Sequence, residues 1–383
     1  KAMSASPKLM ELRFAAHMAF QVQGLKTRDA AGEGDFFDPF WRSLDLEASA
    51  HVPFFESRED WPLLLGSPEF LRPTKYEDLS VLASALTDFM EDISPGMSLN
   101  ETLLIMATHF LESHAFTDEA RILPVAINMN HDIEARRNTG WNWLAKNETL
   151  MVYANRTIAA GEELTICYGL RSNEQLFSLY GFTLPPAVEP ILTCGLGSVA
   201  EFLPAEALEG EVRDFGVRLT TMPFALGKDL LPTDELLAYV LERHEDLVSI
   251  LRLAAKHGAD PLEVLDKIVR TWRQRCRDDE VIAEHIERLE ANRKSLFCSW
   301  VWWANDPAPS EDATEDFSSA EALGNQFRSD VIRYKMSRYL CLLAFEEALA
   351  LRREDPDFEA DVLPQAVLLQ PLLSAVEFYS KRG

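Results

Sequence analysis

The sequence lacks the short signatures of several common enzyme classes. It has no Gly-x-x-x-x-Gly-Lys-Ser/Thr and no Gly-x-Gly-x-x-Gly segment, so neither a phosphate-binding loop nor a dinucleotide-binding fingerprint is predicted. A Gly-x-Ser-x-Gly segment is also absent, which argues against the nucleophile elbow of an α/β-hydrolase. The five cysteines include no Cys-x-x-Cys pair. Their spacing therefore predicts neither a disulfide framework nor a cysteine zinc site, and it is typical of a reducing compartment inside the cell.

The chain is also short of long apolar runs and of basic residues. No apolar run approaches the roughly 18 residues needed to span a bilayer, and the start, Lys1 to Ser4, lacks the apolar core of a signal peptide. Lys and Arg number 37 against 62 Asp and Glu, which gives a formal net charge of −25. An acidic surface repels a phosphate backbone and attracts basic partners. We therefore expect no nucleic acid and no membrane as partners, and a protein partner with a basic surface.

The length of 383 residues favours two domains, and the residue pattern changes along the chain. The first part reads as helices, expected at 7–24, 40–55, 76–90 and 100–113, with a loop at 27–39. The segment 122–130 is short and apolar and is closed by a polar Asn-His-Asp. The segments 150–155 and 164–168 resemble strands, and the turn at 159–161 separates them. Helical sequence resumes at Ser172.

Prolines mark the boundary to the second part. Pro185, Pro186 and Pro190 predict a domain boundary near residue 185. Nearly everything after residue 232 reads as helix, including 233–258, a helix from 261 and another over 325–353, with an acidic loop at 305–319. The helix from 261 has a strong start signal, because Asp260 can cap it and Pro261 suits its first position. The fold class predicted is α+β, a mixed first domain followed by an all-α second domain.

Four segments between residues 113 and 182 carry the most specific pattern. Each is weak alone, but their order and spacing are informative. They are Ser113-His114-Ala115-Phe116, the run from Leu123 to Asn130-His131, the turn Ala160-Gly161-Glu162-Glu163 leading to Tyr168-Gly169, and Ser172-Asn173-Glu174-Gln175 running to Tyr180-Gly181-Phe182.

In this order the segments resemble those of SET-domain methyltransferases, in the branch typified by the Rubisco large-subunit lysine methyltransferase. The resemblance implies a β-rich SET fold over residues 1–185, with a helical insert at about 7–116 and the C-terminal SET part at about 120–185. It further implies an all-helical substrate-binding domain over 190–383. The activity implied is methyl transfer from S-adenosylmethionine, without a metal, to a side-chain nitrogen of a target protein, most simply lysine.

The resemblance also assigns roles to individual residues. Tyr168 corresponds to the active-site tyrosine, whose hydroxyl orients a neutral amine for in-line displacement. The cofactor contacts implied are Ser113, His114, Asn130, His131 and Tyr168, and the substrate contacts implied are Ile127, Tyr180 and Phe182. A lysine nucleophile, with a reference pKa near 10.4, must first lose its proton, which an apolar or aromatic channel favours. Without the surrounding pattern, Tyr168 and Tyr180 read as ordinary packing aromatics.

Three departures from the family pattern keep two alternatives open. His114 stands where relatives have an arginine for the cofactor carboxylate, and Ile127 stands where they have an aspartate. Nothing in Lys1 to Phe20 matches the glycine-rich cofactor strand of relatives, so we expect the chain as given to begin downstream of that strand. The alternatives are a SET-fold binding module that has lost methyl transfer, and a histidine N-methyltransferase. The sequence does not distinguish cytoplasm, nucleus and plastid, and it leaves the oligomeric state open.

Overall fold

The computed structural model describes residues 7–32, 37–44, 84, 100–114, 122–123, 126–134, 136–144, 146, 149–184, 189, 191–196, 200–203, 218–221, 245–291 and 320–354. The chain divides into two compact units. The first consists of Lys1–Arg58, Arg72–Leu170 and Ser178–Gly181, and the second of Glu59–Leu71, Arg171–Phe177 and Phe182–Gly383. The loop at 305–319 and the three boundary prolines lie outside the described residues, as does the predicted helix at 76–90 except for residue 84, which is helical.

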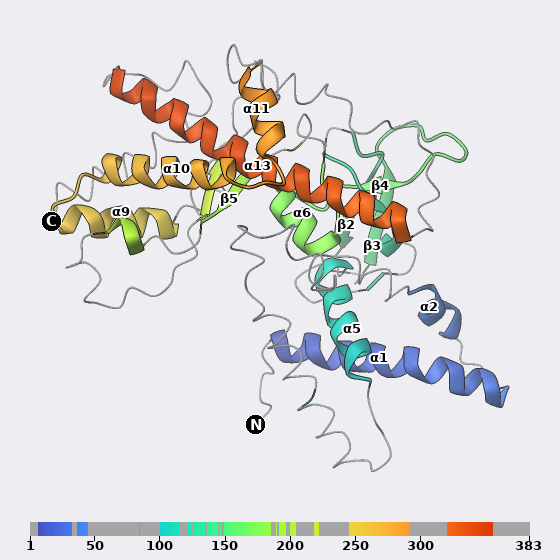
Figure 1. Ribbon diagram of the computed structural model, residues 1–383. Helices are drawn as coiled ribbons and strands as arrows, with labels where there is room; N and C mark the ends of the chain where they lie inside the picture. Colours follow the sequence, from blue (N-terminus) through green and yellow to red (C-terminus); the bar gives the residue numbers. More distant parts are fainter. Residues whose placement is uncertain are drawn as a thin grey trace. The chain divides into compact units, whose positions relative to one another are not determined.

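Helices α1 (Pro7–Ala31), α2 (Asp38–Ser43) and α5 (Glu101–His114) form the helical part of the first unit (Figure 1). Helix α1 packs against α5 through an apolar core that includes Met18, Leu104 and Phe110. The loop predicted at 27–39 was wrong for residues 27–31, which continue α1, and for residues 38–39, which begin α2. Arg28 explains part of this difference, since its guanidinium holds Asp38 at 2.7 Å and fixes the end of the helix. Gly32, with a φ of 69°, then ends it.

Two pairs of short strands form the β part of the first unit. Strand β1 (Asn130–His131) pairs in parallel with β4 (Thr165–Ile166), and β2 (Thr139–Leu144) pairs antiparallel with β3 (Thr149–Ala154). Within the apolar segment 122–130, residues 126–128 form the 3₁₀ helix η2 (Ala126–Asn128). Strand β2 was not predicted. Its tryptophans, Trp141 and Trp143, face Val152 and Leu150 across the ribbon, a cross-strand pairing that stabilises β structure.

Helix α6 (Asn173–Tyr180) begins with a reciprocal cap. The backbone N–H of Gln175 donates to the Ser172 hydroxyl, and the backbone N–H of Ser172 donates to the Gln175 side chain. This is a capping box, in which two otherwise unpaired donors at the helix start are satisfied. Gly181, with a φ of 77°, follows the last residue and turns the chain back. The predicted return to helix after Ser172 is therefore confirmed.

Helices α9 (Glu245–Lys256), α10 (Pro261–Arg277), α11 (Ala283–Ala291) and α13 (Ala320–Glu354) dominate the second unit (Figure 1). The predicted cap is confirmed, because the Asp260 carboxylate accepts a hydrogen bond of 2.9 Å from the backbone of Leu262. Helix α13 packs against α10 around a continuous apolar core that includes Ile268, Trp272 and Leu343.

The sequence analysis predicted an all-α second domain, but the second unit also contains strands. Strands β5 (Leu192–Gly195) and β6 (Arg218–Thr221) form an antiparallel pair that packs against α13, and the 3₁₀ helix η4 (Ala200–Phe202) follows β5. Every residue of β5 is buried. A fully buried strand shows no alternation of apolar and polar residues, so a strand is difficult to predict from its sequence.

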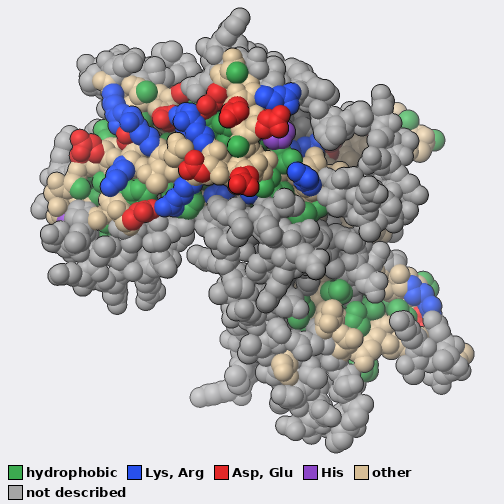
Figure 2. All heavy atoms as spheres, viewed as in Figure 1, with side chains coloured by type: hydrophobic (Ala, Val, Ile, Leu, Met, Phe, Trp, Pro, Cys, Tyr) green, Lys and Arg blue, Asp and Glu red, His purple; other side chains and the backbone are tan. Residues whose placement is uncertain are grey.

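Charged side chains of both signs alternate over the face formed by α10, α11 and α13 (Figure 2). Ion pairs link several of them, such as Arg277 with Glu290 and Arg275 with Glu201, both at or below 2.7 Å. Among the described helices, none combines the length and apolar character required to cross a bilayer.

Candidate active site

The parallel pairing of β1 with β4 brings together two segments that are far apart in the sequence. Asn130 lies opposite Thr165, and His131 lies opposite Ile166. The backbone N–H of Asp132 continues the ladder by donating to the Ile166 carbonyl at 2.9 Å. The Asn-His segment and the segment that ends in Tyr168 therefore meet, as the resemblance implied.

Tyr168 is fixed from three sides. Its backbone N–H donates to His131 Nδ1 at 3.1 Å, and its hydroxyl donates to the Met129 carbonyl at 2.8 Å. Its ring lies 5.1 Å from the His131 ring and 4.7 Å from the Tyr180 ring, measured between centroids. Because His131 Nδ1 accepts a hydrogen bond, a neutral His131 carries its proton on Nε2. The site thus holds one oriented phenol at the edge of an aromatic cluster.

Burial raises the pKa of Tyr168 well above its ordinary value, and the neighbouring Tyr180 and Glu163 add to the rise. The phenol therefore stays protonated across the physiological pH range. It can donate and accept hydrogen bonds, but it cannot serve as an anionic base. This is the chemistry needed to orient a neutral nucleophile.

Asn130 and Glu163 form an exposed polar pair next to this cluster. The Asn130 amide donates to Glu163 Oε1 at 2.5 Å, and both residues are open to solvent. The pair combines an amide, which offers a donor and an acceptor, with a carboxylate. Such a pair can bind an ammonium group and other polar groups of a ligand. The motif pointed to Asn130, but nothing in the sequence analysis singled out Glu163.

Asn138 is a buried residue that ties the strands of this region together, and the sequence analysis missed it. Its Nδ2 donates to the Glu163 carbonyl at 2.7 Å, and its Oδ1 accepts from the backbone N–H of Thr165 at 2.8 Å. Its own carbonyl accepts from Asn155 at 2.8 Å. The Asn138 side chain is only 2% exposed, so its own donor and acceptor depend on these protein partners.

The turn before β4 is held by Glu162. Its carboxylate binds the Arg156 guanidinium and accepts from the backbone N–H of Ala159 at 2.9 Å. Arg156, Ala159 and Asn138 together lower the pKa of Glu162 to about 2. Gly161, with a φ of 84°, supplies the left-handed residue that this turn requires. The Gly-Glu-Glu motif is therefore first a structural turn, which sets the start of β4.

The predicted residues of helix α5 contact one another instead of Tyr168. The Ser113 hydroxyl lies 2.7 Å from His114 Nδ1, and the His114 ring stacks on Phe110 with centroids 4.3 Å apart. Burial lowers the pKa of His114, partly offset by a hydrogen bond to the Phe110 carbonyl. A neutral His114 can donate or accept a hydrogen bond, but it gives no positive charge to replace the arginine of relatives.

The remaining predicted residues have different surroundings. Ile127 is 6% exposed and belongs to the apolar core of the first unit, where it packs with residues of α5 and β4. Phe182 is half-buried and follows Gly181 in the segment that turns back after α6. The described residues contain no group of three or more His, Cys, Asp or Glu side chains placed to hold a metal ion.

Comparison with known proteins bears on the family and the fold. Residues 44–169 match the SET domain family. Its fold is similar to that of Rubisco LSMT, in a structure bound to sinefungin and monomethyllysine, with a TM-score of 0.51 and 14% identity over 89% of this chain and 75% of that chain. A structure of Rubisco LSMT bound to AdoMet matches with a TM-score of 0.49 and 14% identity over 90% and 76%. No curated protein matches the sequence. The resemblance stated from the motifs is thus confirmed.

Proposed function

We propose that this protein is an S-adenosylmethionine-dependent protein N-methyltransferase that acts on a lysine side chain. The observation that carries the proposal is the placement of the Tyr168 hydroxyl. It lies at the Met129 carbonyl, beside the aromatic rings of His131 and Tyr180 and next to the exposed Asn130 amide. A phenol, a backbone carbonyl and a polar pair at one edge of a SET domain are the groups that methyl transfer to an amine requires.

The side chains around Tyr168 fit the chemistry of the cofactor. S-adenosylmethionine supplies a methyl group on a positively charged sulfur, and it also carries an ammonium, a carboxylate and an adenine ring. Glu163 and the amide oxygen of Asn130 suit the ammonium, and Nε2 of His131 offers a donor. The aromatic faces of Tyr168 and Tyr180 suit a cation. Ser113 and a neutral His114 offer hydrogen bonds, without charge, to the carboxylate.

The same groups prepare the acceptor. An amine is a nucleophile only after it has lost its proton, and an aromatic surrounding lowers the pKa of a lysine by disfavouring the charged form. The Tyr168 hydroxyl, whose proton is donated to the Met129 carbonyl, can then accept a hydrogen bond from the neutral amine, which leaves the nitrogen lone pair free to attack the methyl group. Met129 contributes a carbonyl that can attract a polarised methyl group. In this proposal Tyr180 and Phe182 line the lysine channel, and Ile127 supports it from the core.

The proposed substrate is a protein, recognised by the mainly helical second unit. The formal net charge of −25 favours a target lysine within a basic surface, because opposite charge accelerates the encounter. The five cysteines include no Cys-x-x-Cys pair, which favours a reducing compartment as the place of action.

Calorimetry with S-adenosylhomocysteine tests the proposal directly. The full chain should bind this product, and Asn130→Ala should weaken binding about 10-fold, the effect of losing one or two hydrogen bonds. Asn142→Ala is the matched control, because Asn142 is an exposed asparagine on β2, and it should leave the affinity unchanged.

No detectable binding of the wild-type chain at millimolar ligand would overturn the proposal and favour a binding module. If the chain binds, mass spectrometry of proteins labelled by a methyl-labelled cofactor identifies the acceptor residue. Label on histidine instead of lysine would replace the proposed acceptor with the histidine alternative.

A further inference from the structure

Asn173, at the start of α6, connects the two ends of the segment that contains Tyr180. Its side chain is fully buried. Asn173 Oδ1 accepts from the backbone N–H of Leu184 at 2.7 Å, and Nδ2 donates to the Leu184 carbonyl at 3.0 Å. One side chain therefore pairs with both backbone groups of Leu184, as a neighbouring strand would. The segment after α6 is thereby fixed to the residue where the helix begins.

Glu189 and Ser337 form a second layer around Asn173. Glu189 accepts from the backbone N–H of Asn173 at 2.8 Å and from its Nδ2 at 2.9 Å. The Ser337 hydroxyl, on α13, lies 2.6 Å from Glu189 Oε2 and accepts from Asn173 Nδ2 at 3.1 Å. Glu189 is 1% exposed, and no ion pair to it is present in the part of the chain that the structure describes. A buried acid without a cation is costly unless hydrogen bonds satisfy it, as they do here.

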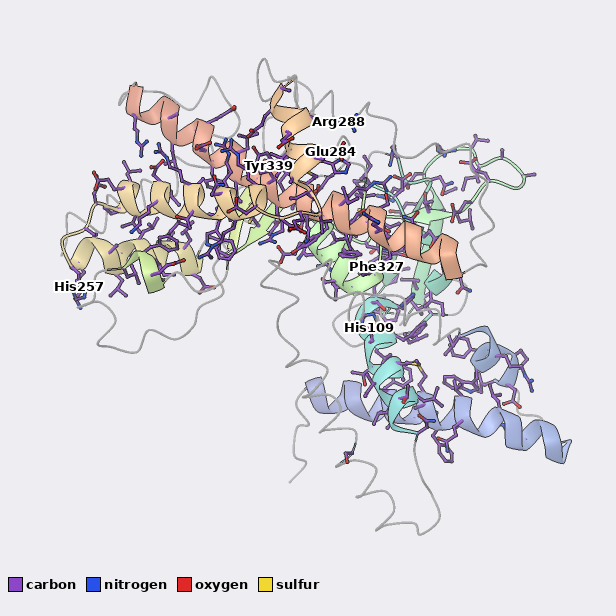
Figure 3. All side chains as sticks on the ribbon, viewed as in Figure 1. His109, His257, Glu284, Arg288, Phe327 and Tyr339 are labelled. Carbon is purple, nitrogen blue, oxygen red and sulfur yellow. The ribbon has the colours of Figure 1, made fainter. Side chains whose placement is uncertain are left out.

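Asp330 holds the other end of the segment. It accepts hydrogen bonds from the backbone N–H of Thr183 at 3.0 Å and from the Thr183 hydroxyl at 2.5 Å. On the same helix, Phe327 packs its ring 5.7 Å from that of Phe177 in α6 (Phe327 is labelled in Figure 3). Helix α13 therefore contacts α6 and the returning segment through polar and aromatic groups at once.

We propose that Glu189, Ser337 and Asp330 are positioning residues for Tyr180, and so for methyl transfer. Tyr180 lies in the chain between Asn173 and Thr183, the two residues that this buried cluster holds. The Tyr180 ring in turn packs on Tyr168, the residue proposed to orient the amine. The inference rests on the proposed function. None of the three residues touches a reacting group, and each acts by fixing the two ends of the segment that carries Tyr180.

The size of the expected effect follows from the geometry that catalysis demands. A misplacement of about 1 Å at a reacting group can lower the rate roughly 100-fold. S-adenosylhomocysteine lacks the positively charged sulfur for which the Tyr168 and Tyr180 rings were proposed, and its other proposed contacts, Asn130, His131, Glu163, Ser113 and His114, are not part of the Asn173 cluster. Loosening the cluster should therefore lower turnover and leave the affinity for S-adenosylhomocysteine within about 2-fold, since no group proposed to bind it is altered.

The test compares Glu189→Ala with Glu189→Gln in the full chain. Glutamine keeps an acceptor for the Asn173 backbone and gains a donor for Ser337, whereas alanine provides neither. Glu189→Ala should lower kcat about 10- to 100-fold, and Glu189→Gln should recover most of it. Glu287→Ala, at an exposed position on α11, is the control and should have wild-type kcat. Hydrogen exchange should increase across residues 173–184 in Glu189→Ala.

Ser337→Ala provides a milder variant in case Glu189→Ala does not fold, and it should lower kcat in the same direction. A wild-type chain that neither binds S-adenosylhomocysteine nor transfers methyl groups contradicts the proposed function itself. If the wild-type chain does both, the positioning role is tested by the variants. Glu189→Ala and Ser337→Ala with the kcat and the hydrogen exchange of wild type would overturn the positioning role and leave the proposed function intact. Equal losses of kcat in Glu189→Ala and Glu189→Gln also contradict it, because the hydrogen bonds would then not matter.

Discussion

The Tyr168 hydroxyl donates a hydrogen bond of 2.8 Å to the backbone carbonyl of Met129. This contact joins the last part of the Gly-Glu-Glu-to-Tyr segment to the residue that precedes Asn130-His131. Backbone carbonyls do not move independently of their strand, so the hydroxyl has a fixed position. Tyr168 therefore provides a preorganised polar group at the proposed reacting centre, which is the arrangement that contributes most to catalysis.

Tyr168→Phe should separate catalysis from binding. The variant removes the hydroxyl and keeps the ring that packs on His131 and Tyr180. We expect kcat to fall about 100-fold, comparable to the loss of one preorganised donor, with the affinity for S-adenosylhomocysteine within about 3-fold of wild type. Steady-state kinetics and calorimetry give the two quantities. Unchanged kcat would remove Tyr168 from the mechanism.

The motif residues that the structure brings together are close in the chain or joined by the β1–β4 pairing. Asn130, His131, Tyr168 and Tyr180 were all predicted, and the structure links them through hydrogen bonds or ring contacts. Ser113 and His114 were also predicted, but they contact each other and Phe110. A motif marks which residues matter, whereas the surrounding packing decides what each side chain touches.

The supporting residues could not be predicted from local pattern. Ser337 lies 148 positions from Glu189 and 164 from Asn173, and no periodicity connects residues at such separations. Asn138 belongs to a polar stretch that reads as an ordinary loop, although the fold buries it. Strand β5 is buried throughout and shows no alternation. Each of these features depends on tertiary contacts, which override local propensity.

Asn138→Ala should be strongly destabilising. The substitution removes the buried side chain that accepts from the backbone N–H of Thr165 and donates to the Glu163 carbonyl. Each lost hydrogen bond costs about 0.5–1.5 kcal/mol, so we expect a loss of about 1–3 kcal/mol in the free energy of unfolding. Urea unfolding followed by tryptophan fluorescence measures it. Asn142→Ala, at an exposed position on β2, should cost less than about 0.5 kcal/mol. Equal losses in the two variants would show that the Asn138 contacts contribute nothing.

Glu189→Gln should change how stability depends on pH. Burial raises the pKa of Glu189 to about 8, opposed by hydrogen bonds from Ser337 and Asn173, against 4.5 for an ordinary glutamate. The titratable groups that face it are Glu174 on α6, which adds to the rise, and Cys341 on α13, whose pKa is also raised by burial. The folded protein thus keeps a proton between about pH 5 and 8 that the unfolded chain releases.

A proton held only by the folded state makes unfolding more favourable as the pH rises through this window. The contribution of Glu189 to stability is therefore full below pH 4.5 and is lost progressively up to about pH 8, by at most about 1.4 kcal/mol per pH unit. Glutamine carries no titratable proton. The free energy of unfolding of Glu189→Gln minus that of wild type should accordingly increase from pH 5 to pH 8, as urea unfolding at each pH would measure. Glu287 is exposed on α11, so the free energy of unfolding of Glu287→Gln should change with pH in the same way as that of wild type. A constant difference for Glu189→Gln as well would mean that Glu189 is ionised in the folded protein, with Ser337 and Asn173 as donors to a carboxylate.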